Sequence, residues 1–211
     1  MFHSITKFFS FLILCCYFSS SYADPASDQL LQLLNTIHTL QADFTQVVTD
    51  AKGRTLNRAE GQMSLQRPGK FRWNVQHPNA QLIVTNGKKI WIYEPDLEQL
   101  TIRYLGKEAG ETPALLLSNT NETLTKDFSV QTVNSADMQW FLLKPKDKGS
   151  MFEKIKLGFV KQEIRQMQLQ DHLGHTTVIQ LNRIVMNSTL SPSLFNFKAS
   201  GKVDVIDETK K

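Results

Sequence analysis

Arg67-Pro-Gly-Lys-Phe-Arg-Trp73 joins a turn signal to the beginning of an aromatic strand. The Pro-Gly pair interrupts the backbone pattern, and apolar Phe71, Trp73 and Val75 then alternate with polar residues. This period of two favours a strand with one buried face. A positive charge therefore stands at the start of an aromatic strand, an arrangement typical either of a structural corner or of the rim of an apolar pocket.

Segments with the same period recur along most of the chain, separated by turn signals such as Asn86-Gly87 and Asp171-His-Leu-Gly174. We expect strands near residues 44–50, 58–66, 71–76, 81–86, 89–94, 99–104, 127–133, 139–144, 153–160, 163–171, 175–182 and 184–187. Many strands joined by tight turns predict a mainly β fold of the α+β kind, with one meandering, strongly curved antiparallel sheet that forms an unclosed barrel.

An amphipathic helix is expected at the start of the mature chain, where Asp24 and Pro25 suit a cap and a first turn. Apolar residues then follow at steps of three and four: Leu30, Leu33, Leu34, Ile37, Leu40 and Phe44. Such a stripe packs on another apolar surface. Leu30, Leu33 and Leu34 are therefore candidates for lining an apolar interior.

Residues 105–126 break the strand rhythm and are too many for a simple hairpin loop. Thr112 can cap a short helix that begins at Pro113, and Leu115, Leu116 and Leu117 make it apolar. These leucines need a cover, and the concave face of the sheet is the nearest one. We expect a helical lid over an apolar cavity.

The first 23 residues resemble a secretory signal, with one lysine, an apolar run and the ending Ser21-Tyr22-Ala23. Cleavage after Ala23 would leave residues 24–211 as a single domain in the periplasm. Both cysteines, Cys15 and Cys16, would be removed, which excludes disulfides and thiolate chemistry in the mature chain. A lipid-modified cysteine is the alternative, but Leu14 precedes Cys15 where such processing needs a small residue.

The charge of the mature chain is mildly positive. Without Lys7, 23 basic side chains face 20 acidic ones, an excess too small and too dispersed for a nucleic-acid-binding protein. Lys144, Lys146 and Lys148 are typical of a solvated loop. A weak attraction to an anionic membrane surface or to an acidic partner remains open.

Catalytic and metal-binding patterns are poor. His172 and His175 fall on a predicted turn without further ligands nearby, and no serine stands in Gly-x-Ser-x-Gly. We therefore expect a protein that is not an enzyme and has no catalytic residue, metal or cofactor.

The aromatic side chains of the strands, Trp91 among them, allow two interpretations. Alternation alone favours an ordinary core, whereas a lid favours a cavity lined by Phe71, Trp73 and Trp91. Arg67 likewise is either a surface residue in a weak salt bridge or a latch whose guanidinium donates to carbonyl groups at the ends of the lid helices.

One set of motifs resembles the LolA family of outer-membrane lipoprotein carrier proteins, most specifically over residues 67–99. The motifs are Phe44-Thr45-Gln46, Gly61, Arg67-Pro68, Phe71-Arg72-Trp73, Pro78, Gly87-Lys88, Trp91, Tyr93, Pro95, Glu98-Gln99, Thr112-Pro113 and Phe195-Asn196-Phe197. The resemblance implies a periplasmic chaperone in which Arg67 holds the lid and Phe71 and Trp73 line the cavity.

The same resemblance implies three partners: acylated lipoproteins as cargo, an inner-membrane ABC lipoprotein exporter that supplies them, and an outer-membrane lipoprotein receptor. We expect a monomer with no nucleic-acid partner and no stable membrane insertion. The alternative is a periplasmic binding module of similar fold that senses lipids or lipoproteins. Many acylated cargoes would favour the carrier, and one regulatory partner the sensor.

Overall fold

The computed structural model describes residues 25–105, 113–118, 121–135, 137–198 and 203–210. The predicted signal segment 1–23 and the predicted cap Thr112 lie outside these residues. Among the helices within them, none is long and apolar enough to cross a membrane.

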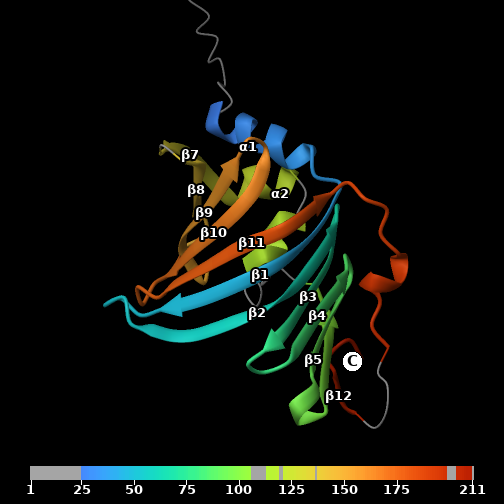
Figure 1. Cartoon of the computed structure of the whole chain (residues 1–211). Coiled ribbons are helices and arrows are strands. Elements are labelled where there is room, and N and C mark those ends of the chain that lie inside the picture. The colour runs from blue at the N-terminus through green and yellow to red at the C-terminus, as the bar shows by residue number, and fades with distance from the viewer. Residues whose placement is uncertain (1–24, 106–112, 119–120, 136, 199–202, 211) are drawn as a thin grey trace, which may run out of the picture.

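The strands form one sheet of twelve, and the expected mainly β, curved and open fold is confirmed (Figure 1). The strands are β1 (Thr39–Thr49), β2 (Thr55–Gln66), β3 (Lys70–His77), β4 (Gln81–Asn86), β5 (Lys89–Glu94), β6 (Gln99–Tyr104), β7 (Phe128–Asn134), β8 (Gln139–Pro145), β9 (Phe152–Val160), β10 (Glu163–Asp171), β11 (Thr176–Met186) and β12 (Asp204–Asp207). Their order across the sheet is β12-β6-β5-β4-β3-β2-β1-β11-β10-β9-β8-β7.

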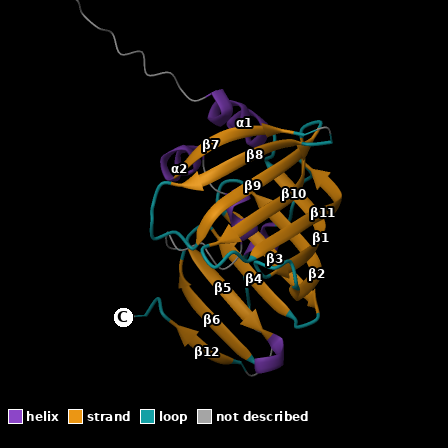
Figure 2. Ribbon diagram, turned by 90° about the vertical axis from the view of Figure 1, so that its left-hand side faces the viewer, coloured by secondary structure: helices purple, strands orange, loops and turns teal. Residues whose placement is uncertain are grey.

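The centre of the sheet is strand β1, which pairs antiparallel with β2 on one side and with β11 on the other. Phe44 on β1 stands opposite Gly61 on β2 and Leu181 on β11. The two outermost strands, β12 and β7, stand at opposite ends of the strand order. The sheet therefore curls without closing, and its concave face surrounds a helical segment (Figures 1 and 2).

Four helical elements of the described chain matter for the site. They are α1 (Pro25–Asn35), α2 (Asn121–Asp127) and the 3-10 helices η3 (Pro113–Ser118) and η4 (Pro192–Phe195). Helix α1 crosses one end of the sheet, as Figure 1 shows. The short helix expected to begin at Pro113 corresponds to η3, and α2 follows it in the chain.

Two expectations about element boundaries are wrong. The apolar stripe of the first helix is expected to run to Phe44. The helix instead ends at Asn35, and both Leu40 and Phe44 belong to β1. The segment 184–187 is not a separate strand, because β11 continues to Met186. The twelfth strand is instead β12, which pairs parallel to β6.

The sheet carries apolar residues on both faces in the half formed by β3 to β6. The concave face holds the main core, which includes Phe71, Ile83 and Ile90. On the opposite face Val84 is fully buried. The C-terminal segment η4, whose Phe195 is also buried, contacts β3 and β4 there. A core on one face and a C-terminal cover on the other explain why β4 and β5 carry runs of consecutive apolar residues, Leu82-Ile83-Val84 and Ile90-Trp91-Ile92.

Candidate functional site

The concave face presents a stack of aromatic rings. Phe44 and Trp73 stack with their ring centroids 3.5 Å apart, and Phe71 lies 6.0 Å from Trp73 on the same strand. All three side chains are buried. They come from β1 and β3, which are separated by β2, so Gly61 of β2 leaves the space in which Phe44 reaches Trp73. A Cβ built on Gly61 would lie 3.0 Å from the Phe44 ring and 1.9 Å from the carbonyl oxygen of Asn74.

We call the rings of Phe44, Phe71 and Trp73 the aromatic floor. Side chains of η3 and α1 cover it. Leu116 and Leu117 of η3 are buried in the same core, and η3 contacts β2 and β3. Leu30 and Leu34 of α1 are also buried there, while Leu33 is partly buried against it. The side chain of Leu115 lies outside what the structure describes. The apolar residues predicted from three separate segments thus meet in one place, apart from Leu115, whose side chain is not described, and Trp91.

Trp91 requires a correction, because it lies on the other face of the sheet. In the β4–β5 pair Ile90 stands opposite Thr85 and Trp91 stands opposite Val84. Since neighbours along a strand point to opposite faces, Ile90 shares the concave face with Phe71, and Trp91 does not. The indole belongs to the face that η4 covers.

Arg67 lies at the junction of β2 and β3, where its side chain bonds the end of α1 and its backbone bonds the segment between α1 and β1. Its Nη1 donates to the carbonyl oxygen of Leu34 at 2.7 Å, and its amide donates to the carbonyl of His38 at 2.9 Å. Burial lowers the pKa of Arg67 below the usual arginine value, although an arginine stays charged at any physiological pH. The acceptor on Leu34 is one of the last carbonyls of α1, which lack partners within the helix.

The lid segment is tied to the sheet by backbone hydrogen bonds at both ends. The Gly69 amide donates to the carbonyl of Ser118, the last residue of η3, at 2.8 Å. The Leu105 amide, just before the lid, donates to the carbonyl of Lys88 at 2.8 Å. The predicted latch residue therefore stands next to a second, main-chain anchor at Gly69.

Several residues of the site were not predicted as such. Phe44 is expected both in the stripe of the first helix and at the start of the strand over 44–50, and the structure places it in β1. On the outer face, Arg72 donates from Nη1 to the carbonyl of Leu194 at 3.4 Å, and burial lowers its pKa. Tyr93 lies 5.2 Å from Phe197 between ring centroids. Only the alternation of Arg72 with the aromatics indicated that it faces away from the core.

No cluster of three or more His, Cys, Asp or Glu side chains suited to a metal ion occurs within the described residues. His175 bonds Asp171 in the turn between β10 and β11, and His172 bonds the carbonyl of Ser150. Both histidines thus have structural partners in a turn.

An open curled sheet whose aromatic concave face is covered by a short anchored lid defines a class of single-sheet proteins built to enclose an apolar ligand. The family model of the outer membrane lipoprotein carrier protein LolA matches residues 35–198. The chain belongs to this family.

Named relatives and solved structures agree with this assignment. An outer-membrane lipoprotein carrier protein from Legionella pneumophila is 43% identical over 199 residues, covering 94% of this chain and 98% of the relative. One from Pseudomonas paraeruginosa is 39% identical over 192 residues, with 90% and 92% covered. The fold is shared with a LolA superfamily protein from Nitrosomonas europaea, with a TM-score of 0.52 at 12% identity over 82% of this chain and 98% of that one.

Proposed function

We propose that this protein is a periplasmic chaperone that holds the acyl chains of lipoproteins on its concave face and delivers them to the outer membrane. The observation that carries the proposal is the aromatic floor of Phe44, Phe71 and Trp73 beneath leucines of a short helical segment. The family to which the chain belongs supports the same role.

Energetics favour exchange of the lid leucines for an acyl chain. Each buried methylene is worth about 0.8 kcal/mol, so a long acyl chain gains on the order of 10 kcal/mol. Uncovering two leucines costs roughly 3 to 6 kcal/mol. Because Leu116 and Leu117 pack on the concave face, the cargo must displace them, and the difference between the two free energies suffices to drive that displacement.

Release requires the opposite bias, which the anchors of the lid supply. The bond from Gly69 to Ser118 and the bond from Arg67 to Leu34 hold the covering elements against the sheet. A hydrogen bond from a charged donor contributes about 1.5 to 3 kcal/mol. That amount favours the closed state without preventing opening. Arg67 thus acts as a latch, with α1 as its described acceptor.

Two further partners belong to the proposal. An inner-membrane ABC exporter would load the protein, and an outer-membrane receptor would unload it. The protein would act as a monomer in the periplasm, following removal of residues 1–23, and would perform no catalytic step.

Photo-crosslinking tests the proposal by comparing the two faces of the sheet. A photoreactive amino acid at Leu116, on the concave side, should crosslink to a triacylated lipoprotein released from inner-membrane vesicles. The same amino acid at Trp91, on the opposite face, should not. Equal crosslinking at both positions, or none at Leu116 while cargo is demonstrably bound, would contradict enclosure on the concave face.

The identity of the captured proteins separates the carrier from the sensor. Mass spectrometry of protein purified gently from cells should find many acylated lipoproteins. Recovery of a single regulatory protein without acylated cargo would contradict the carrier role.

A further inference from the structure

Three hairpin tips meet at one rim of the molecule. They connect β1 to β2, β8 to β9, and β10 to β11. His172 Nε2 lies 2.9 Å from the carbonyl oxygen of Ser150, which joins two of the tips. A Cβ built on Gly174 would lie 3.0 Å from the Cβ of Ala51, so the third tip is also in contact.

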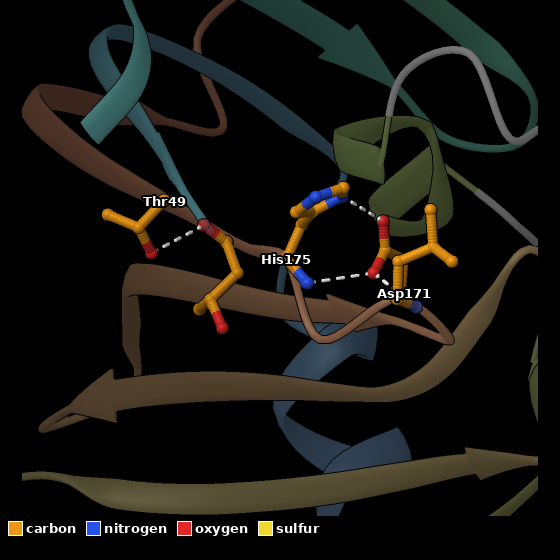
Figure 3. A network of polar contacts seen from close by, with 5 residues as sticks. Thr49, Asp171 and His175 are labelled. Carbon is orange, nitrogen blue, oxygen red and sulfur yellow. Dashed lines mark hydrogen bonds and ion pairs between the residues drawn. The ribbon is translucent and has the colours of Figure 1, made fainter. Parts of the chain in front are cut away.

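The tip at 171–175 is fixed by its aspartate (Figure 3). Asp171 Oδ1 accepts hydrogen bonds from the amides of Leu173 and His175 at 2.8 Å each, and Oδ2 lies 2.8 Å from His175 Nδ1. Gly174 closes the turn with a φ of +82°. The carboxylate is therefore engaged within its own turn.

The tip at 50–54 repeats this design. Asp50 Oδ1 accepts from the amides of Lys52 and Arg54 at 2.9 Å each, and Oδ2 accepts from Arg54 Nε at 2.7 Å. Gly53 has a φ of +78°. In each tip the one acidic side chain, Asp50 or Asp171, is bonded within its own turn. The carboxylate of Asp50 pairs with the Arg54 side chain and not with the Lys52 ammonium group.

Basic residues outnumber acidic ones around these tips, in residues 50–58, 144–154 and 171–175, which we call the basic rim. These ranges contain seven of the 23 lysines and arginines after Ala23 but only four of the 20 acidic residues. The whole formal excess of three positive charges therefore falls within the basic rim.

Two large apolar side chains protrude from the hairpin tips of the basic rim, and a third, Leu56 on the adjoining strand β2, is 56% exposed. Leu173 is 75% exposed and Met151 is 61% exposed. They stand singly on separate tips, and Lys52 and Lys148 are exposed on the same rim. Neither Leu173 nor Met151 belongs to the core.

We propose that the basic rim docks reversibly on the surface of a bilayer that contains anionic lipids, with Leu173 and Met151 entering the interface between headgroups and acyl chains. Lysines and arginines near such a surface are attracted to it, and apolar side chains add partition into it. The centre of a protein interface is depleted of charged residues, lysine among them, whereas here single apolar side chains stand on separate tips among lysines. This proposal does not depend on cargo binding.

The chain offers a matched control at another hairpin tip. Leu97, between β5 and β6, is 65% exposed, but its neighbours Glu94, Asp96 and Glu98 are acidic. An anionic surface should repel this tip. Replacement of Leu97 thus removes a comparable exposed leucine without removing a docking residue.

Co-sedimentation of the cargo-free protein with vesicles tests the proposal. Vesicles of equal parts phosphatidylglycerol and phosphatidylcholine should bind the protein, and binding should weaken when salt is raised or phosphatidylglycerol is omitted. Leu173→Ser should weaken binding about tenfold, and Leu173→Ser with Met151→Ser should weaken it further. Leu97→Ser should bind like the unmodified protein.

Charge reversal provides an independent measurement. Lys52→Glu with Lys148→Glu should abolish binding, whereas Lys161→Glu, on the exposed turn between β9 and β10, should reduce it only slightly. Equal binding by Leu173→Ser, salt-independent binding, or binding to an acidic protein but to no vesicle would each overturn the proposal. Vesicle binding without any lipoprotein capture would instead contradict the carrier function and leave this surface intact.

Discussion

Gly69 and Gly87 approach so closely that a Cβ built on Gly69 would lie 3.1 Å from the Cα of Gly87. Each glycine closes a hairpin turn with a positive φ, of +75° and +89° respectively. The amide of Gly69 also bonds the end of η3, and Lys88, beside Gly87, bonds the start of the lid segment. Both ends of the lid are thus attached to two turns that touch each other.

Gly69→Ala should therefore loosen the lid as well as strain a turn. The positive φ alone costs roughly 1 to 2 kcal/mol, and the new methyl group must also separate the two turns. Gly53→Ala is the matched control, because Gly53 has a φ of +78° and nothing within 4 Å of its would-be Cβ. Urea unfolding should show a larger loss for Gly69→Ala, and hydrogen exchange at the amide of residue 69 should speed up. Equal stability losses with unchanged exchange would refute the anchoring role.

Arg67→Leu should preserve the fold and shift the lid toward the open state. It removes the guanidinium donor of Leu34, a contribution of about 1.5 to 3 kcal/mol, while the amide bond to His38 remains. We expect lipoprotein to be taken up but transferred slowly to the receptor. Arg67→Lys should recover part of the transfer, since lysine keeps the charge but not the planar fork. Unchanged transfer by Arg67→Leu would exclude the latch.

Much of the sheet could be predicted from period and turns, but the end of the first helix could not. Leu40 and Phe44 continue the helical spacing of Leu34 and Ile37 and also, with Ala42, alternate as in a strand. Both periods fit the same residues, so the outcome depends on pairing. Pairing of β1 with β2 and β11 decides it, and β11 is far away in the sequence.

Strand β12 could not be predicted for a different reason. Three of its four residues are exposed and two are aspartates, so it lacks a buried alternating face. It is held by main-chain pairing with β6, and the Asp204 amide also donates to the carbonyl of Glu98, just before that strand. Such bonds depend on where the chain returns and not on side-chain type.

The site was predictable as a set of apolar segments, while the partner of each residue was not. The sequence pattern does not distinguish Trp91 from Phe71. The C-terminal segment covers the outer face of the sheet, so strand β5 carries apolar residues on that face as well as on the concave one. The carbonyl of Leu34 on α1 is an acceptor of Arg67 that the sequence did not indicate. Both details follow from tertiary contacts with segments distant in sequence.

Trp73→Ala should destabilise the protein strongly, by about 3 to 5 kcal/mol, because a buried aromatic residue is removed from a packed face. It also deprives Phe44 of its stacking partner. Trp91→Ala is the control from the opposite face and should cost less, since that indole is only half-buried. Urea denaturation measures both losses. A greater loss of stability for Trp91→Ala than for Trp73→Ala would mean that the principal core lies on the outer face of the sheet and not on the concave one.

The turn at Asp50 should make a pH-dependent contribution to stability. Hydrogen bonds from the Arg54 amide and then from the Arg54 side chain lower the pKa of Asp50. A carboxyl group whose pKa is lower in the folded state stabilises that state at pH values above its unfolded pKa of about 3.9, and the contribution disappears as the pH falls through the lowered value. Asp50→Asn should thus be less stable than the unmodified protein at pH 7.

Below pH 4 the two proteins should converge, because protonation removes the charge that the asparagine lacks already. Urea unfolding of both proteins between pH 7 and pH 3 measures this difference. Thr45→Ala, an exposed change on β1 that leaves every carboxyl group in place, should show the same pH dependence as the unmodified protein. A stability difference for Asp50→Asn that stays constant across this range would mean that the Asp50 charge makes no contribution to the turn.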